Sequence, residues 1–178
     1  VQDWGGILGL TLPMNFPNRF SRLIVMNTAL PIGESLGMGF QSWRDYVASK
    51  PDMDCGALIK RACPHVSEAE AACYEAPFPD QSYKAGVRRF PELVMIKPEM
   101  AGVQTTRRAA EFWQNEWLGQ SFMAIGAKDP VLGGEVMNDL RKTIRNCPEP
   151  MILEEAGHFV QEWGDQVAKA ALKHFAGN

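Results

Sequence analysis

An aspartate stands in a glycine-rich turn at the start of the chain, where residues 1–6 read VQDWGG. The two glycines that follow Asp3 and Trp4 allow a sharp strand-to-helix turn, because small residues let the backbones approach closely. Such a turn lifts the side chain at its centre out of the sheet and towards a cavity. A carboxylate in that position can act as a nucleophile and form a covalent ester with a substrate. Asp3 is therefore a candidate nucleophile.

Two further acid–base residues follow segments that are typical of buried strands. Asp129 comes after the apolar segment 120–126, and His158 comes after the segment 150–154. Open α/β sheets place their sites at the carboxyl ends of the strands, so all three side chains are expected at one edge of a sheet. The chain order of nucleophile, acid and histidine is also the order found in α/β-hydrolase triads.

Each of these residues also has a simpler interpretation. Asp3 could cap the helix that follows it, and His158 could cap the last helix of the chain. Asp129, directly before Pro130, could cap a turn. The occurrence of all three in this order, each at the end of a strand, favours the catalytic interpretation.

The hydrophobic pattern predicts an α/β sheet. Continuous apolar runs, as in parallel strands buried on both faces, predict strands at 22–27, 120–126 and 150–154. Helical patterns are predicted at 7–12, 40–49, 55–62, 67–74, 83–90, 105–117, 135–145 and 160–175. Three tryptophans are expected to pack in the core, namely Trp113, Trp117 and Trp163.

A helical insertion interrupts this sheet. No strand signal occurs between residues 40 and 98, and a glycine-rich stretch, 31–39, leads into that region. Ser67 and Glu70 have the spacing of a capping box at the start of one of its helices. We therefore predict a hydrolase core in residues 1–33 and 105–178, and a helical cap in residues 34–104.

The composition limits what the chain can bind. Its 178 residues, 46% of them hydrophobic, can bury one sizeable core. Lys and Arg number 18 against 21 Asp and Glu, which gives a net charge of −3 and no basic stripe for nucleic acid or an acidic membrane surface. The longest apolar runs are far shorter than the ~20 residues of a membrane-spanning helix.

The four cysteines form no CxxC pair, and His65 stands too close to Cys63 for the usual zinc-ligand spacing. We therefore expect reduced, partly buried thiols, and neither a metal site nor a cofactor. Free thiols favour a reducing, cytoplasmic location.

Five segments carry a resemblance to a known family. They are residues 1–6, 76–80 (APFPD), 112–115 (FWQN), 122–126 (FMAIG) and 156–162 (AGHFVQE). Through them the chain resembles the haloalkane dehalogenases of the α/β-hydrolase superfamily, in particular the branch that acts on short chloroalkanes. The resemblance covers nearly the whole chain. Epoxide hydrolases share the Asp-Trp-Gly-Gly motif, but the closing segment and Trp43 narrow the choice.

The resemblance implies hydrolytic dehalogenation of short haloalkanes by water, with halide as a product. Asp3 would displace the halide and form an alkyl ester, His158 would activate the water that hydrolyses the ester, and Asp129 would hold the imidazole. The indole N–H groups of Trp4 and Trp43 would bind the leaving halide without bringing in water, because tryptophan is a donor only. The residues that match positions lining the apolar substrate pocket are Phe40, Phe90, Val94, Val131 and Leu132.

Two other functions stay open. Epoxide hydrolases use the same Asp-His-Asp triad but activate the epoxide oxygen with tyrosines of the lid, and Tyr46, Tyr74 and Tyr83 are available. The other is a catalytically inactive relative that binds small apolar ligands. The retention of all three triad residues argues against it.

The chain departs from the family in its extent. The family's sheet begins well before the nucleophile, whereas no strand is predicted before Asp3, and only the backbone N–H of Trp4 maps onto the family's oxyanion hole. We therefore expect an incomplete α/β-hydrolase fold, the C-terminal portion of a longer enzyme, with an unpaired sheet edge and low or absent activity by itself. The segment between Asn27 and Phe40 is shorter than in well-known relatives, which affects the entry to the cap and the size of the pocket.

Overall fold

The computed structural model describes residues 1–177 and divides the chain into two compact units. The first unit comprises Val1–Ser35 and Met95–Asn178, and the second comprises Leu36–Val94. Residues 95–104 therefore belong to the first unit. The assignment of residues 34–104 to a cap over a hydrolase core stays a prediction.

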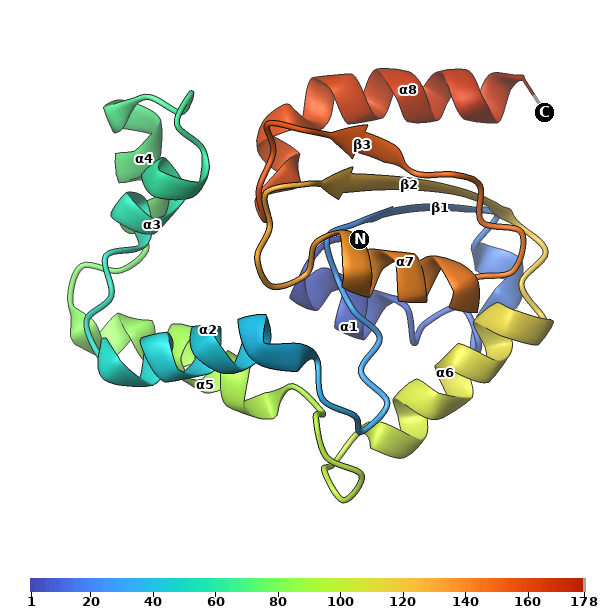
Figure 1. Cartoon of the computed structure of the whole chain (residues 1–178), viewed down its shortest axis with the longest axis horizontal. Helices are drawn as coiled ribbons and strands as arrows, with labels where there is room; N and C mark the ends of the chain where they lie inside the picture. The colour runs from blue at the N-terminus through green and yellow to red at the C-terminus, as the bar shows by residue number, and fades with distance from the viewer. Residues whose placement is uncertain (178) are drawn as a thin grey trace. The chain divides into compact units, whose positions relative to one another are not determined.

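The first unit is built on a parallel three-stranded sheet with the strand order β1-β2-β3 (Figure 1). The strands lie where the apolar runs predicted them, at β1 (Arg22–Met26), β2 (Gln120–Gly126) and β3 (Met151–Leu153). In the register of the sheet, Arg22 lies opposite Gln120 and Ala124 lies opposite Met151. β2 is the central strand, and every one of its residues after Gln120 is buried, because a central parallel strand is covered on both faces.

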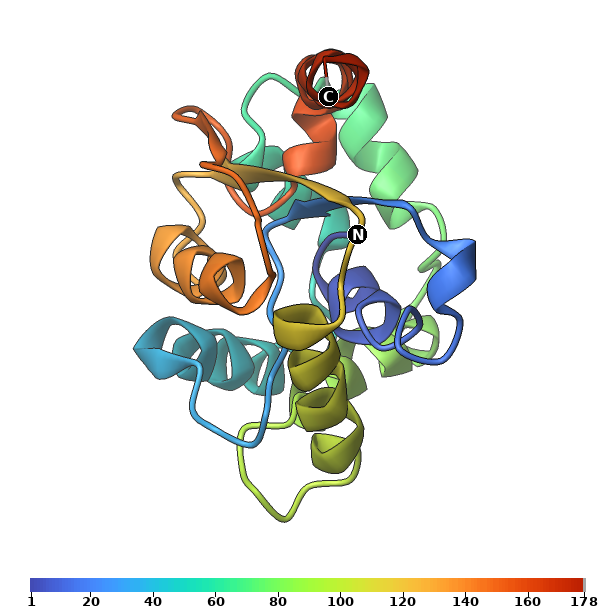
Figure 2. The ribbon, with the colours of Figure 1, turned by 90° about the vertical axis from the view of Figure 1, so that its right-hand side faces the viewer.

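Helices supply this cover. On one face lie α1 (Trp4–Gly9), α6 (Val103–Asn115) and α7 (Gly134–Thr143), and on the other lies α8 (Gly164–Ala176) (Figure 1). Figure 2, which looks along α8, shows the sheet between these two layers. The 3-10 turns η1 (Pro17–Arg19) and η3 (Val160–Trp163) precede β1 and α8. Parallel neighbours need crossover connections, which is why helices alternate with the strands.

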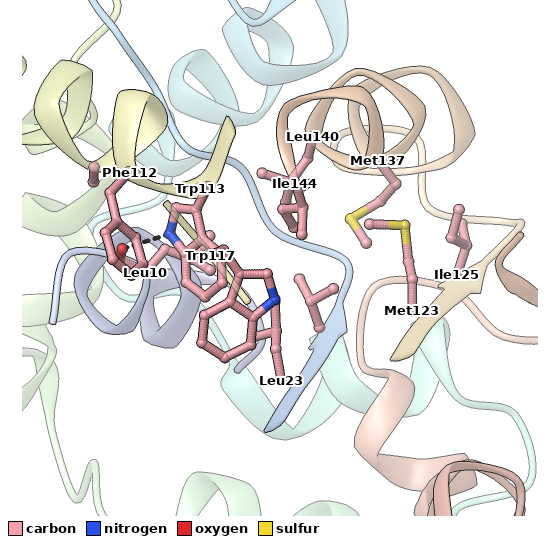
Figure 3. Packing of buried hydrophobic residues seen from close by; sticks show 12 residues of the cluster. Leu10, Leu23, Phe112, Trp113, Trp117, Met123, Ile125, Met137, Leu140 and Ile144 are labelled. Atoms are coloured by element: carbon pink, nitrogen blue, oxygen red, sulfur yellow. Dashed lines mark hydrogen bonds between the residues drawn. The ribbon is translucent and has the colours of Figure 1, made fainter. Parts of the chain in front are cut away.

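One of two hydrophobic clusters in this unit packs α1, α6 and α7 against β1 and β2 (Figure 3). In this cluster the ring centroids of Trp113 and Trp117 lie 4.7 Å apart. Trp113 Nε1 donates to the Leu10 carbonyl at 2.7 Å, and Trp117 Nε1 donates to the Ser121 hydroxyl at 3.0 Å, so both buried indoles are hydrogen-bonded. Trp163 packs against the second cluster, on the α8 face. The predicted packing roles of these tryptophans are confirmed.

The second unit is helical. Its elements are α2 (Gly37–Ser49), α3 (Cys55–Ala62), α4 (Glu68–Glu75), η2 (Gln81–Lys84) and α5 (Ala85–Leu93). α2 packs against α5, and α3 packs against α4. The buried ammonium of Lys84 joins these parts, because it lies 2.6 Å from Glu75 and 2.9 Å from Asp52. The other oxygen of Glu75 accepts the N–H groups of Cys55 and Gly56 at the start of α3.

Some helix boundaries differ from the predicted ones: α1 begins and ends three residues before the predicted 7–12, and two other helices begin with a 3-10 turn. The Asp80 carboxylate accepts the N–H of Ser82 at 2.8 Å and caps a 3-10 turn, so the helix predicted at 83–90 begins only at Ala85. The helix predicted at 160–175 likewise begins with a 3-10 turn, η3, before it continues as α8.

The first residues of the chain run beside β1 and lead into the turn at Asp3. The Val1 ammonium donates to the Ile24 carbonyl at 2.8 Å, and the Met26 N–H donates to the Val1 carbonyl at 3.0 Å. Gln2 forms a parallel bridge with Met26. The segment before Asp3 has only two residues, Val1 and Gln2, which is too short to show a hydrophobic periodicity. This bridge could therefore not be predicted from the sequence. It gives the turn the strand-to-helix geometry of an elbow, since α1 begins at the residue after Asp3.

All four cysteines are free thiols. Cys55 and Cys147 are partly buried, as predicted, whereas Cys63 is fully buried and Cys73 is exposed. No helix in residues 1–177 combines the length and the apolar character needed to cross a bilayer.

The two glycines of the elbow differ in the space around them. A Cβ on Gly6 would lie 2.0 Å from the Thr28 hydroxyl oxygen, whereas no described neighbour outside its own helix lies within 4 Å of a Cβ on Gly5. We expect Gly6→Ala to lower the free energy of unfolding by about 1–3 kcal/mol through overpacking. Gly5→Ala, the matched control, should leave it unchanged or raise it by about 0.5–1 kcal/mol, because alanine favours the helix. Urea unfolding measures both, and equal stabilities would contradict the packing argument.

Candidate active site

Asp3 lies in the turn between the Gln2–Met26 bridge and α1, with an unusual backbone conformation. Its φ of 46° is rare for a residue other than glycine. Hydrogen bonds hold the turn on both sides, since the Asp3 N–H donates to the Asn27 carbonyl at 3.0 Å and the Thr28 hydroxyl donates to the Asp3 carbonyl at 2.6 Å. The carboxylate makes no capping bond to α1 and is 42% exposed. Asp3 therefore occupies the N-cap position of α1, as the simpler interpretation expects, but its side chain does not cap the helix and is exposed instead.

Asp129 follows β2, and its side chain is completely buried. Its Oδ2 lies 2.8 Å from His158 Nδ1, and its Oδ1 accepts the N–H groups of Val131 at 2.8 Å and Leu132 at 3.0 Å. The residue thus caps its own turn, as the simpler interpretation expects, and also holds the imidazole. Burial opposes ionisation, but hydrogen bonds from His158 and Asn27 outweigh it and hold the pKa of Asp129 below its ordinary value.

His158 lies in the loop after β3, with its ring between two carboxylates. Its Nδ1 faces Asp129, and its Nε2 lies 3.4 Å from Oδ1 of Asp3. The N-cap of η3 is Phe159, so the interpretation of His158 as a helix cap is wrong. Because the ionised Asp129 can only accept, Nδ1 carries a proton and Nε2 is the atom free to exchange one. The three side chains have the geometry that a nucleophile, its base and an orienting acid need.

This order and geometry of residues agree with a comparison of the sequence with known families. Residues 1–165 match the family described as alpha/beta hydrolase fold. The chain belongs to this family. The predicted α/β-hydrolase fold is thus confirmed.

The relatives of this chain include haloalkane dehalogenases. It is 35% identical to one from Psychrobacter cryohalolentis, over 99% of this chain and 59% of that protein, and 34% identical to one from Mycolicibacterium paratuberculosis, over 97% and 58%. Among solved structures, a tetrameric haloalkane dehalogenase from Paraglaciecola agarilytica has 46% identity and a TM-score of 0.93, over 97% of this chain and 58% of that one. The chain therefore spans less than two thirds of the length of these relatives. The resemblance predicted from the motifs is confirmed.

The two carboxylates next to His158 determine the charge of its ring. Burial of the imidazole lowers its pKa, but the hydrogen bonds and negative charges of Asp129 and Asp3 outweigh this and raise the pKa of His158 to about 9. At neutral pH the ring is therefore an imidazolium as long as Asp3 is ionised. When Asp3 is neutral, one of the two contacts that favour the imidazolium is lost.

Two residues that the sequence analysis did not single out, Asn27 and Thr28, join the parts of the site. Asn27 is fully buried at the end of β1. Its Nδ2 donates to Asp129 Oδ2 at 2.9 Å and to the Gly126 carbonyl at 3.1 Å, and its Oδ1 accepts the Gly126 N–H at 2.8 Å. Thr28 holds the carbonyl of Asp3. In the sequence, these two residues could have been found as a polar pair that directly follows an apolar strand, because the sites of open sheets lie at the carboxyl ends of the strands.

The two predicted halide-binding tryptophans lie in different units. Trp4 is the first residue of α1, directly after Asp3. Trp43 lies in α2 and stacks on Tyr46, with 6.0 Å between the ring centroids. Their common role in halide binding stays a prediction. Within the described chain, no group of three or more His, Cys, Asp and Glu side chains offers a metal site.

The predicted pocket residues are also divided between the units. Val131 and Leu132 follow Asp129 in the first unit, where Leu132 is buried and Val131 is half-buried. In the second unit Phe40 and Val94 are buried, whereas Phe90 is 43% exposed. Their role as the lining of one pocket stays a prediction.

Neutralising Asp3 tests the electrostatic coupling in the site. We expect Asp3→Asn to lower the pKa of His158 from about 9 by at least about one pH unit, because a carboxylate near Nε2 is lost. Asp139→Asn, an exposed change on α7, should leave this pKa unchanged. Titration of the His158 ring by nuclear magnetic resonance measures both. A pKa that does not fall in Asp3→Asn would show that the charge of Asp3 and the ionisation of the imidazole are not coupled.

Proposed function

We propose that this hydrolase is a haloalkane dehalogenase, which converts short haloalkanes and water into alcohols and halide. The observation that carries the proposal is the Asp3 carboxylate, 3.4 Å from Nε2 of a histidine whose Nδ1 binds a buried aspartate. A carboxylate that forms an ester needs a base for the second half of the reaction, and His158 is within reach as that base. Dehalogenase relatives with 34% and 46% identity support the same assignment.

In the first half-reaction, an ionised oxygen of Asp3 attacks the carbon that bears the halogen, from the side opposite the leaving group. The new oxygen–carbon bond forms as the carbon–halogen bond breaks, and the bonding electron pair leaves with the halide. We assign the binding of this halide to the indole N–H groups of Trp4 and Trp43, which donate and cannot accept. The apolar lining for the substrate is assigned to Phe40, Phe90, Val94, Val131 and Leu132, with residues 34–104 as the cap.

The second half-reaction hydrolyses the ester. Esterification removes the negative charge of Asp3, so the pKa of His158 falls, the imidazolium loses its proton to solvent, and the neutral ring can accept a proton from water. The water oxygen attacks the ester carbonyl. We assign the stabilisation of the negative charge that develops on the carbonyl oxygen to the backbone N–H of Trp4. The bond to the alkoxide then breaks, His158 returns its proton to the alkoxide, and loss of the carboxylic proton regenerates Asp3. Asp129 keeps the ring oriented throughout.

The proposed partners are thus a short haloalkane, water and halide, with no cofactor, nucleic acid or membrane surface. A preference for short chloroalkanes follows the branch that the motifs resemble. A cytoplasmic location is proposed because all four cysteines are free thiols.

A trapped ester would test the proposed chemistry directly. In the full-length protein, His158→Gln should still form the alkyl ester but fail to hydrolyse it, because no base remains to activate water. Incubation with a short haloalkane should release about one equivalent of halide and add one alkyl mass to the peptide containing Asp3. The matched variant Asp3→Asn/His158→Gln should show neither. Mass spectrometry and halide measurement decide the outcome.

Absence of an adduct in His158→Gln would exclude this route. Epoxide opening that depends on Tyr46, Tyr74 or Tyr83 would support an epoxide hydrolase instead.

Halide binding by the two indoles has its own test. Bromide or iodide should quench the tryptophan fluorescence of the full-length protein, and both Trp4→Phe and Trp43→Phe should weaken halide binding at least about tenfold, since each removes one donor. Trp163→Phe removes an indole that packs against the α8 face and should leave the halide affinity unchanged. Equal halide affinities in all three variants would contradict the assignment.

A further inference from the structure

Gln2, the residue directly before the nucleophile, contacts His158 at two points. Its Nε2 donates to the His158 carbonyl at 2.9 Å and lies 3.4 Å from the ring Nε2 of the same residue. The backbone of Gln2 is fixed by its bridge to Met26, so its side chain reaches the histidine from a defined position beside β1. These contacts connect the strand that leads into the elbow with the loop that carries the imidazole.

The carbonyl of His158 determines how the Gln2 amide is oriented. A carbonyl oxygen can only accept a hydrogen bond, so the NH2 group of the amide, and not its oxygen, must face the histidine. That group has a second N–H, on the nitrogen 3.4 Å from the ring Nε2. This donor meets a lone pair when the ring is neutral, but it meets another N–H when the ring is an imidazolium.

We propose that Gln2 is a positioning residue for the hydrolytic step: it anchors the loop that carries His158, and its amide donor favours the neutral ring, which has a lone pair at Nε2. The inference rests on the proposed function, since a lone pair at Nε2 is what activates water in that reaction. Gln2 acts through His158 and is not itself a catalytic residue.

The charged groups around the ring explain when this preference matters. Asp3 and Asp129 face His158 and both favour the imidazolium, while Lys128 and Glu155 pair with each other at exposed positions on the neighbouring loops. With Asp3 ionised, the carboxylates prevail over a neutral amide. Once Asp3 is an ester, its charge is gone and the Gln2 donor remains, so the balance moves towards the neutral base.

The contact of the Gln2 amide with the imidazole ring is weaker than its contact with the His158 carbonyl. A nitrogen–nitrogen separation of 3.4 Å is longer than the ~2.7–3.2 Å of a normal N–H hydrogen bond, so the Nε2 lone pair is only weakly engaged by the amide. The strong bond of Gln2 is the one to the His158 carbonyl, at 2.9 Å. Gln2 is therefore a weak donor to the ring, and a water molecule can compete with it for the Nε2 lone pair.

The first test measures the ionisation of His158 and needs no catalytic activity. Asp3→Asn supplies a background without the charge of Asp3, as in the ester. In that background we expect Gln2→Met to raise the pKa of His158 by about 0.5 pH units or more, and Gln2→Glu to raise it further, because a carboxylate accepts from the imidazolium. Gln166→Met, the same change at an exposed position of α8, should have no effect.

The outcomes of this titration separate the proposal from a merely structural role. A pKa of His158 that stays the same or falls in Gln2→Met would overturn the proposal, because the loss of the amide donor would then not favour the imidazolium. If Gln2→Met does not fold, Gln2→Glu decides alone, since it keeps the size of the side chain.

The second test measures the two half-reactions in single turnovers of the full-length protein with a short haloalkane. Gln2→Met should slow hydrolysis of the ester at least about tenfold and change its formation by less than about twofold, because Gln2 acts on the base and not on the nucleophile. Equal slowing of both steps would overturn the assignment to the hydrolytic step. If the unmodified protein releases no halide, the proposed function fails, whereas the titration still decides whether Gln2 biases the ring.

Discussion

The imidazole of His158 lies between two carboxylates of opposite character, and the site depends on this arrangement. Asp129 is completely buried and fully hydrogen-bonded, so its charge and position are constant. Asp3 is 42% exposed, and its charge can be removed by ester formation. The charge next to Nε2 of His158 therefore depends on whether Asp3 is ionised or esterified. This change converts a resting imidazolium into a base at the stage of the proposed reaction that needs one.

The sheet fixes the distances on which this coupling depends. The carboxyl ends of parallel strands meet at one edge, so the residues that follow β1, β2 and β3 become neighbours although they are far apart in the chain. Asn27 and Thr28 at the end of β1 contact both sides of the site, one through Asp129 and the other through the backbone of Asp3. The end of a single strand thus holds the side chain of Asp129 and the backbone of Asp3 in place. The positive φ of Asp3 persists because these contacts surround it.

Structural and catalytic interpretations of one residue need not exclude each other. One oxygen of Asp129 caps a turn and the other orients the imidazole, so a turn-capping signal in the sequence was correct and incomplete. Gln2 is similar, since its backbone bridges to β1 and its side chain contacts His158. In both cases a local structural bond leaves the group rigid, and rigidity is what a group that orients a catalytic side chain requires.

The sequence by itself determined the elements and the order of the chemistry-bearing residues. Continuous apolar runs predicted the strands because parallel strands are buried on both faces, and the capping box of Ser67 and Glu70 predicted the start of α4 because its bonds are local. Only the tertiary structure decided the roles of Asn27 and Gln2, whose partners, Asp129 and His158, lie more than one hundred residues away. Strand register sets those contacts, and no local pattern of residues encodes it.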